Sequence, residues 1–117
     1  MERTVIIDGQ PVKFKATGKT PVLYKEHHQR EIWDDIPKLQ AAAQTGVMSG
    51  EAVQILERVA YTMAKQADPE IPEMEDWLDQ FEFLSIPRAF PEILVLWNLN
   101  EKTTVKSKKK AGKRREG

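Results

Sequence analysis

The residues best suited to metal chemistry are two adjacent histidines, His27 and His28. Neighbouring side chains on a helix point about 100° apart, so these two cannot chelate one metal ion as an i, i+4 pair can. Glu31 follows His27 by four residues, which leaves a weak two-ligand site as the alternative. We expect a partly exposed helix surface here and no metal.

Carboxylates form two groups that could supply acid–base chemistry. Asp34 and Asp35 are adjacent, and a longer cluster comprises Glu73, Glu75, Asp76, Asp79 and Glu82. General acid–base catalysis needs two carboxylates that face one cleft in different environments. Both groups fall on segments that read as solvated helix surface, and neither has the alternating ligands and central glycine of a calcium loop. A hydrolase built on the acidic cluster is therefore the weakest of three functional hypotheses.

Nucleophilic and phosphate-binding motifs are missing from the sequence. Ser49, Ser85 and Ser107 lack a G-x-S-x-G setting, and no glycine-rich loop is suited to cradle a phosphate. The chain has no cysteine, which excludes disulfides, thiol catalysis, thiolate zinc sites and iron–sulfur clusters. We expect a binding protein that is not an enzyme and needs no cofactor.

Length and composition indicate one folded domain. The 117 residues are 40% hydrophobic and 31% charged, which is enough apolar material for a core. No run approaches the roughly 18 apolar residues of a membrane span, and Met1 to Asp8 lack the pattern of a signal peptide. We expect a soluble, intracellular protein with no membrane contact.

Charge is divided sharply along the chain although it sums to zero. Residues 1–100 hold ten Lys or Arg and 16 Asp or Glu, for a net charge of −6, whereas residues 101–117 hold eight Lys or Arg and two Glu, for +6. The second segment is also of low complexity. We therefore predict a domain over residues 1–100 and a disordered basic tail over residues 101–117.

The elements that must position these residues begin with a β-hairpin over residues 4–17. Val5 to Ile7 are β-branched, Asp8-Gly9 is a dipeptide typical of tight two-residue turns, and the return strand alternates Val12, Phe14 and Ala16 with lysines. Pro11 cannot donate a ladder hydrogen bond and must lie at the turn or on an edge.

A helical body over residues 20–99 follows, with about four helices. We expect Thr20 to cap the first helix, which runs towards Thr45 and is kinked or divided near Ile36 by Pro37. The second begins after Ser49 with a broad apolar face and ends before Pro69. A short acidic helix comes next, and a last helix capped by Ser85 completes an α+β fold that is mostly α.

Aromatic and aliphatic residues crowd the last third of the body. Their number is close to the limit of what so small a domain can bury, so residues left over form a candidate surface for a partner helix or a second copy of the chain. The predicted partner-binding residues on the last two helices are Trp77, Phe81, Phe90, Leu94 and Trp97. The alternative is that they are ordinary core.

The basic tail offers a second functional hypothesis, a small nucleic-acid-associated protein that binds phosphates through its lysines. The tail holds no aromatic residue on which bases could stack, and the acidic body would repel a nucleic acid. These two features argue against nucleic acid as a partner.

Four passages of the sequence form a recognisable pattern when taken together. They are T-V-I-I-D-G-Q-P-V-K-F-K-A-T at residues 4–17, A-Y-T-M-A-K-Q-A-D-P at residues 60–69, E-D-W-L-D-Q-F at residues 75–81, and I-L-V-L-W-N-L-N at residues 93–100, with T-T-V-K-S-K-K-K at residues 103–110. In this order and spacing they resemble the tail assembly chaperones of long, flexible-tailed phages and prophages of Gram-positive bacteria. The resemblance covers residues 4–110, and the segment at 60–69 is its most specific part.

This resemblance implies that the chain acts in the bacterial host cytoplasm, coats the tape measure protein to keep it soluble, and is absent from the mature virion. It also implies a longer product, made by ribosomal frameshifting, which recruits tail tube protein. Lys108, Lys109 and Lys110 mark the region where slippage is expected. Many copies along one tape measure imply a homo-oligomer. A slippery heptamer in the gene at this place would test the expectation.

Overall fold

The computed structural model describes residues 1–97, so the predicted tail and Lys108–Lys110 lie outside the described residues. Two strands come first, β1 (Glu2–Ile7) and β2 (Gln10–Lys15). The helices that follow are α1 (Thr20–His28), α2 (Ile32–Thr45), α3 (Gly50–Ala67), α4 (Met74–Leu78), α5 (Ser85–Arg88), α6 (Phe90–Leu94) and the 3₁₀ turn η1 (Val95–Trp97). A hairpin followed by a helical body confirms the predicted α+β, mostly α fold.

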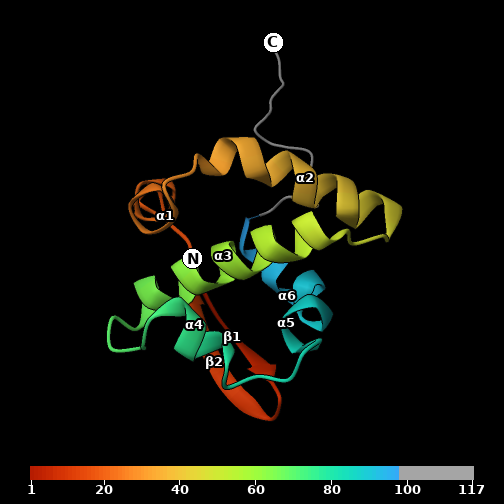
Figure 1. The fold of residues 1–117 in the computed structure, drawn as a ribbon. Coiled ribbons are helices and arrows are strands. Elements are labelled where there is room, and N and C mark those ends of the chain that lie inside the picture. The colour runs from red at the N-terminus through yellow and green to blue at the C-terminus, as the bar shows by residue number, and fades with distance from the viewer. Residues whose placement is uncertain (98–117) are drawn as a thin grey trace.

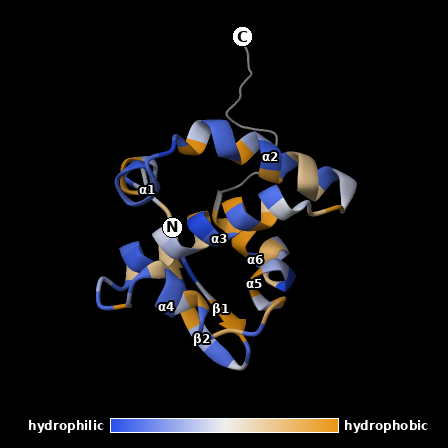
Figure 2. Cartoon of the chain, viewed as in Figure 1, coloured by the Kyte–Doolittle hydropathy of each residue, from blue (hydrophilic) through white to orange (hydrophobic). Residues whose placement is uncertain are grey.

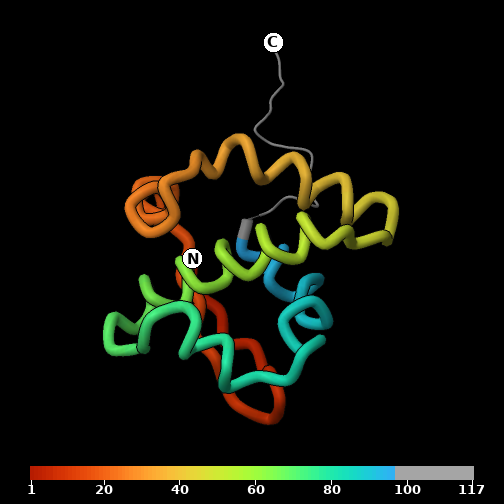
Figure 3. Tube along the Cα trace, in the orientation of Figure 1, coloured from red at the N-terminus to blue at the C-terminus, as the bar shows by residue number. Residues whose placement is uncertain are grey.

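Helix α3 forms the centre of the molecule. Helices α1 and α2 pack on one side of it, and the hairpin, α4 and α5 pack on the other (Figure 1). The tube in Figure 3 shows α2 running alongside α3 for most of its length. Figure 2 shows apolar residues concentrated where these elements meet. Because α3 has neighbours on both sides, its buried residues extend well beyond a single stripe: Ala52, Ile55, Leu56, Val59, Ala60, Tyr61, Thr62, Met63 and Ala64.

The hairpin has the predicted turn and faces. Asp8 and Gly9 both have positive φ, 54° and 75°, which is the conformation of a type I′ turn. Val5 and Phe14 are fully buried against the helices, whereas the intervening Ile6 is 62% exposed and lies opposite Pro11 on the outer face. The hairpin therefore packs within its own chain, as an isolated two-stranded sheet must to be stable.

The prediction of a first helix that runs from residue 20 towards residue 45 is wrong. The structure has two helices here, α1 and α2, with a break at residues 29–31. Gln29 adopts the left-handed region at φ 55°, and its N–H closes α1 on the Lys25 carbonyl at 2.8 Å. Pro37 lies inside a continuous α2, because its missing N–H deprives only one backbone carbonyl of a partner.

The break is stabilised by an ion pair that sequence periodicity does not reveal. Arg30, in the connector, donates from Nε and from its terminal nitrogen to the two carboxylate oxygens of Asp35, at 2.8 and 2.6 Å. Tyr24 of α1 donates to the same carboxylate at 2.6 Å. The expectation that Asp35 lies on solvated surface is thus wrong: its side chain is fully buried.

Two predicted caps are also corrected. Thr20 lies inside the first turn of α1, and its hydroxyl donates to Gln66 of α3 at 2.7 Å instead of capping the helix. Ser85 donates to the Asp8 carboxylate in the hairpin turn. Ser49 does cap α3, accepting from the Ala52 N–H at 3.1 Å. A hydroxyl can serve either role, and the tertiary partner decides between them.

Candidate partner-binding groove

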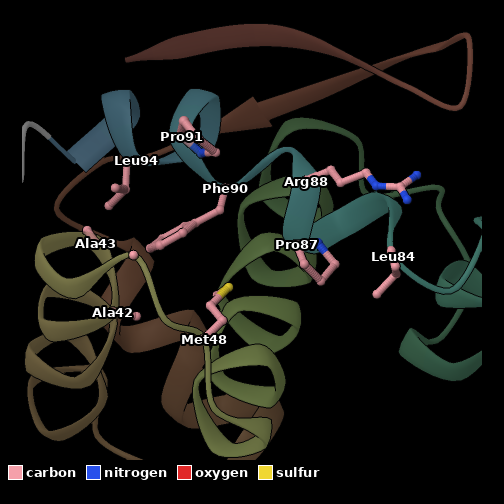
Figure 4. Close-up of a pocket in the computed structure, with 10 residues that line it drawn as sticks. Ala42, Ala43, Met48, Leu84, Pro87, Arg88, Phe90, Pro91 and Leu94 are labelled. Carbon is pink, nitrogen blue, oxygen red and sulfur yellow. The ribbon is translucent and has the colours of Figure 1, made fainter.

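An apolar groove lies between the end of α2 and the α5–α6 segment (Figure 4). Its volume is about 530 Å³, and we call it the Phe90 groove. The residues that line it are Ala42, Ala43, Gly46, Met48, Leu84, Pro87, Arg88, Phe90, Pro91 and Leu94.

One wall of the groove is built by the turn from α2 to α3. Gly46 ends α2 with φ 75°, and its N–H donates to the Ala42 carbonyl at 2.9 Å. The chain then passes through Val47 and Met48 to the Ser49 cap. Ala42 and Ala43 carry only methyl groups, so they leave room between α2 and α6 into which the Phe90 ring extends (Figure 4).

Pro91 shapes the opposite wall because it divides the last predicted helix into α5 and α6. Pro91 has no N–H to donate to the Pro87 carbonyl four residues earlier, so helical bonding is interrupted there. Ala89 lies between α5 and α6 at φ −85° and ψ −1°. The chain turns at this point and presents Pro87, Phe90 and Leu94 to the groove.

The start of α5 is held by the hairpin turn. The Asp8 carboxylate accepts from the Ser85 hydroxyl and from the Glu82 N–H, the latter at 2.7 Å. These hydrogen bonds, with a smaller contribution from the Arg88 charge, hold the pKa of Asp8 below its usual range. The contact spans more than 70 residues of sequence and fixes the wall that carries Leu84 and Pro87.

Exposed apolar residues occur in the lining of the Phe90 groove and next to it in the sequence. Leu84, in the lining, is 45% exposed; its sequence neighbour Phe83 is 91% exposed, and Val47, between the lining residues Gly46 and Met48, is 69% exposed. Exposed apolar surface that continues into a concave groove marks a binding surface. We refer to Val47, Phe83 and Leu84 as the rim.

The five predicted site residues do not come together. Phe90 and Leu94 line the Phe90 groove, with Phe90 mostly buried and Leu94 half-buried. Trp77 and Phe81 lie elsewhere, beside β2 and the end of α3. Trp97 ends η1, and the described side chains do not include it. A single groove over the last two helices is therefore corrected to a groove that uses α6, α5 and α2.

Trp77 is a core residue in this fold. It is 3% exposed and makes edge-to-face contacts with Tyr61 at 5.6 Å and with Phe81 at 5.1 Å between ring centroids. Tyr61 in turn donates to the Pro72 carbonyl at 2.8 Å. This aromatic cluster attaches α4 to α3.

The acidic cluster of the sequence supplies no residue to the lining of the Phe90 groove. Arg88 is the charged residue in its lining, and its guanidinium extends away from Phe90 (Figure 4). The carboxylates of Glu73, Glu75, Asp76, Asp79 and Glu82 are exposed on α4 and the loops that flank it. Apolar contact is therefore the chemistry that this groove offers.

Sequence reasoning missed Met48, Leu84 and Pro87 of the lining, and it missed the rim. The available signal was the placement of the apolar pairs Val47-Met48 and Phe83-Leu84 in connecting segments, where polar residues predominate. Helical periodicity cannot find such pairs because they do not lie on helices.

The histidines lie apart from the groove. His28 Nε2 is 3.2 Å from the Thr62 hydroxyl oxygen, and Thr62 itself donates to the Arg58 carbonyl. Burial, with a smaller effect of the His27 charge, lowers the pKa of His28 to about 4. Within residues 1–97, no group of three or more His, Cys, Asp or Glu side chains is arranged to hold a metal ion. In the same residues, no helix has the length and apolar content needed to cross a bilayer.

No protein-family model, curated protein or solved structure matches this chain.

Proposed function

We propose that this protein is a tail assembly chaperone of a long-tailed phage or prophage, and that its Phe90 groove binds amphipathic helices of the tape measure protein. The observation that carries the proposal is an apolar groove of about 530 Å³ with a water-exposed apolar rim. Such a groove covers the apolar stripe of a helix that would otherwise aggregate.

The four passages that resemble the family support the proposal through the places they occupy. In the described residues they form the hairpin, the second half of α3, α4 with the residues after it, and the end of α6 with η1. The most specific passage organises the fold: Gln66 binds Thr17 and Thr20, and Lys65 donates to the Ile71 carbonyl at 2.8 Å. The motif thus holds the connector between β2 and α1 and the connector that leaves α3.

In this proposal the chain works in the host cytoplasm during assembly and is left out of the finished virion. Several copies associate along one tape measure, and a longer frameshifted product recruits tail tube subunits. Lys108 to Lys110, where the frame would change, belong to the part outside the described residues.

The test is co-expression with an amphipathic helical fragment of a phage tape measure protein that is insoluble alone. The wild-type chain should keep the fragment soluble and be recovered with it, and Leu84→Asp should lose most of this effect. Val22→Asp is the matched control, because Val22 is 54% exposed on α1, away from the groove.

Circular dichroism must show that both variants are folded. Equal protection by Leu84→Asp and wild type would reject the Phe90 groove as the binding site. Failure of the wild-type chain itself to protect any such fragment would reject the proposed function.

A further inference from the structure

A second apolar groove lies at the other end of α2. It has a volume of about 500 Å³ and is lined by residues that include Ala16, Pro21, Trp33, Ile36, Pro37 and Leu96; we call it the Trp33 groove. Trp33 is 66% exposed although it is a large aromatic residue. A tryptophan so exposed beside an apolar groove is unfavourable in water unless something covers it.

The described chain ends at this groove. Leu96 lines it and is 4% exposed, and the next residue, Trp97, is the last one that the structure describes. Consecutive Cα atoms are about 3.8 Å apart, so the three peptide units that link Leu96 to Leu99 can span at most about 11 Å. Leu99 is therefore tethered within reach of the groove at high effective concentration.

The composition of residues 98–117 singles out the same position. Among these 20 residues, Leu99 and Val105 are the large hydrophobic ones, and Leu99 is flanked by Asn98 and Asn100. The described body carries ten Lys or Arg and 16 Asp or Glu, whereas residues 98–117 carry eight Lys or Arg and two Glu. The resulting net charges of −6 and +6 attract the segment to its own body.

We propose that residues 98–100 of the same chain dock in the Trp33 groove, with Leu99 as the anchor that covers Trp33. A second copy of the chain would have to overcome the loss of translational and rotational freedom on association, whereas the tethered segment avoids this loss. Docking of this segment fills the Trp33 groove and leaves the Phe90 groove open. The inference is independent of the proposed function.

The absence of cysteine allows a direct test on the full-length chain. In the double variant Gln40→Cys with Asn98→Cys, one cysteine is in the groove lining and the other is beside Leu99. Mild oxidation at low micromolar concentration should give an intramolecular disulfide. The control pair is Gln10→Cys with Asn98→Cys, since Gln10 lies at the hairpin turn and outside the groove, and it should give much less.

A second measurement uses Gln40→Cys alone and follows the rate at which a small thiol reagent modifies it. Leu99→Asp should raise this rate several-fold, whereas Val105→Asp should leave it unchanged. Equal rates in the three chains, or no preference for the Gln40 pair, would overturn the proposal. Disulfides that link two chains would also overturn it, because they would identify a second copy as the occupant.

Discussion

The buried carboxylate of Asp35 allows a strong test of how α1, α2 and α3 are joined. It accepts hydrogen bonds from Tyr24 at 2.6 Å and from two nitrogens of Arg30 at 2.6 and 2.8 Å, and Arg58 of α3 donates to the Tyr24 hydroxyl at 3.3 Å. Asp35→Asn keeps the shape of the side chain, removes its charge and replaces one acceptor by a donor. At least one hydrogen bond to the Arg30 guanidinium must then be lost.

The expected cost follows from these contacts. A hydrogen bond to a charged group contributes about 1.5–3 kcal/mol, and breaking a fully buried ion pair costs about 3–5 kcal/mol. The Arg30 side chain is 41% exposed, so water can solvate part of its charge after the substitution. We therefore expect Asp35→Asn to lower the free energy of unfolding by about 2–3 kcal/mol.

Urea denaturation followed by circular dichroism measures this loss. With an m-value of about 1–1.5 kcal/mol/M for a domain of this size, the midpoint should fall by about 2 M. Asp34→Asn is the matched control: Asp34 is the exposed neighbour, and its substitution should change stability by less than about 0.5 kcal/mol. If the two variants unfold at the same urea concentration, our account of the Asp35 network is incorrect.

The same network predicts a dependence on acid. The hydrogen bonds from Arg30 lower the pKa of Asp35 to about 2 from a value of 3.8 in the unfolded chain. A depressed acid pKa contributes stability above the unfolded value, and this contribution is lost as the pH falls through the folded value. The wild type should therefore lose stability between about pH 4 and pH 2, and Asp35→Asn should show a shallower slope in that window.

Three further predictions concern other parts of the fold. Burial lowers the pKa of His28 to about 4, so the folded state resists protonation of this side chain. The free energy of unfolding should therefore fall as the pH drops from 6.5 towards 4. His28→Gln should flatten this slope in denaturation curves taken across that range. Gly46→Ala should lower the free energy of unfolding by about 1–2 kcal/mol, because Gly46 has a φ of 75° that an alanine adopts only with strain. Gly18, whose φ is not positive, is the control, and Gly18→Ala should change the free energy of unfolding by less than about 0.5 kcal/mol in the same assay. Equal effects of the two substitutions would contradict this reasoning. Ser85→Ala should raise the pKa of Asp8 towards its ordinary value in an NMR titration, and an unchanged pKa would show that Arg88 or the Glu82 N–H dominates instead.

Local chemistry was sufficient to predict several elements. The Asp8-Gly9 turn follows from two residues that tolerate positive φ, and the faces of the return strand follow from its alternation of apolar residues with lysines. Helix α3 follows from the Ser49 cap and a long apolar face. Each of these depends on interactions within a few residues, so the sequence pattern contains them.

The groove depended on contacts that no short pattern encodes. Phe90 and Leu94 were predicted as partner-binding residues, but Met48 and Leu84 come to line the same groove only when α2 and α5 both pack on α3. Trp77 and Phe81 had the same apolar character and spacing, and they packed against Tyr61 instead. Which apolar side chains remain exposed is decided by the area that other elements cover.

The sequence by itself determined a hairpin, a central amphipathic helix, an acidic body and a segregated basic segment, because turn chemistry, periodicity and charge are local properties. The tertiary structure decided where the first helix breaks, since Gln29 turns the chain so that Arg30 can reach Asp35. It also decided that Ser85 and Thr20 bind distant partners instead of capping helices. For both hydroxyls a long-range hydrogen bond to an anchored group outcompetes a local one of similar strength.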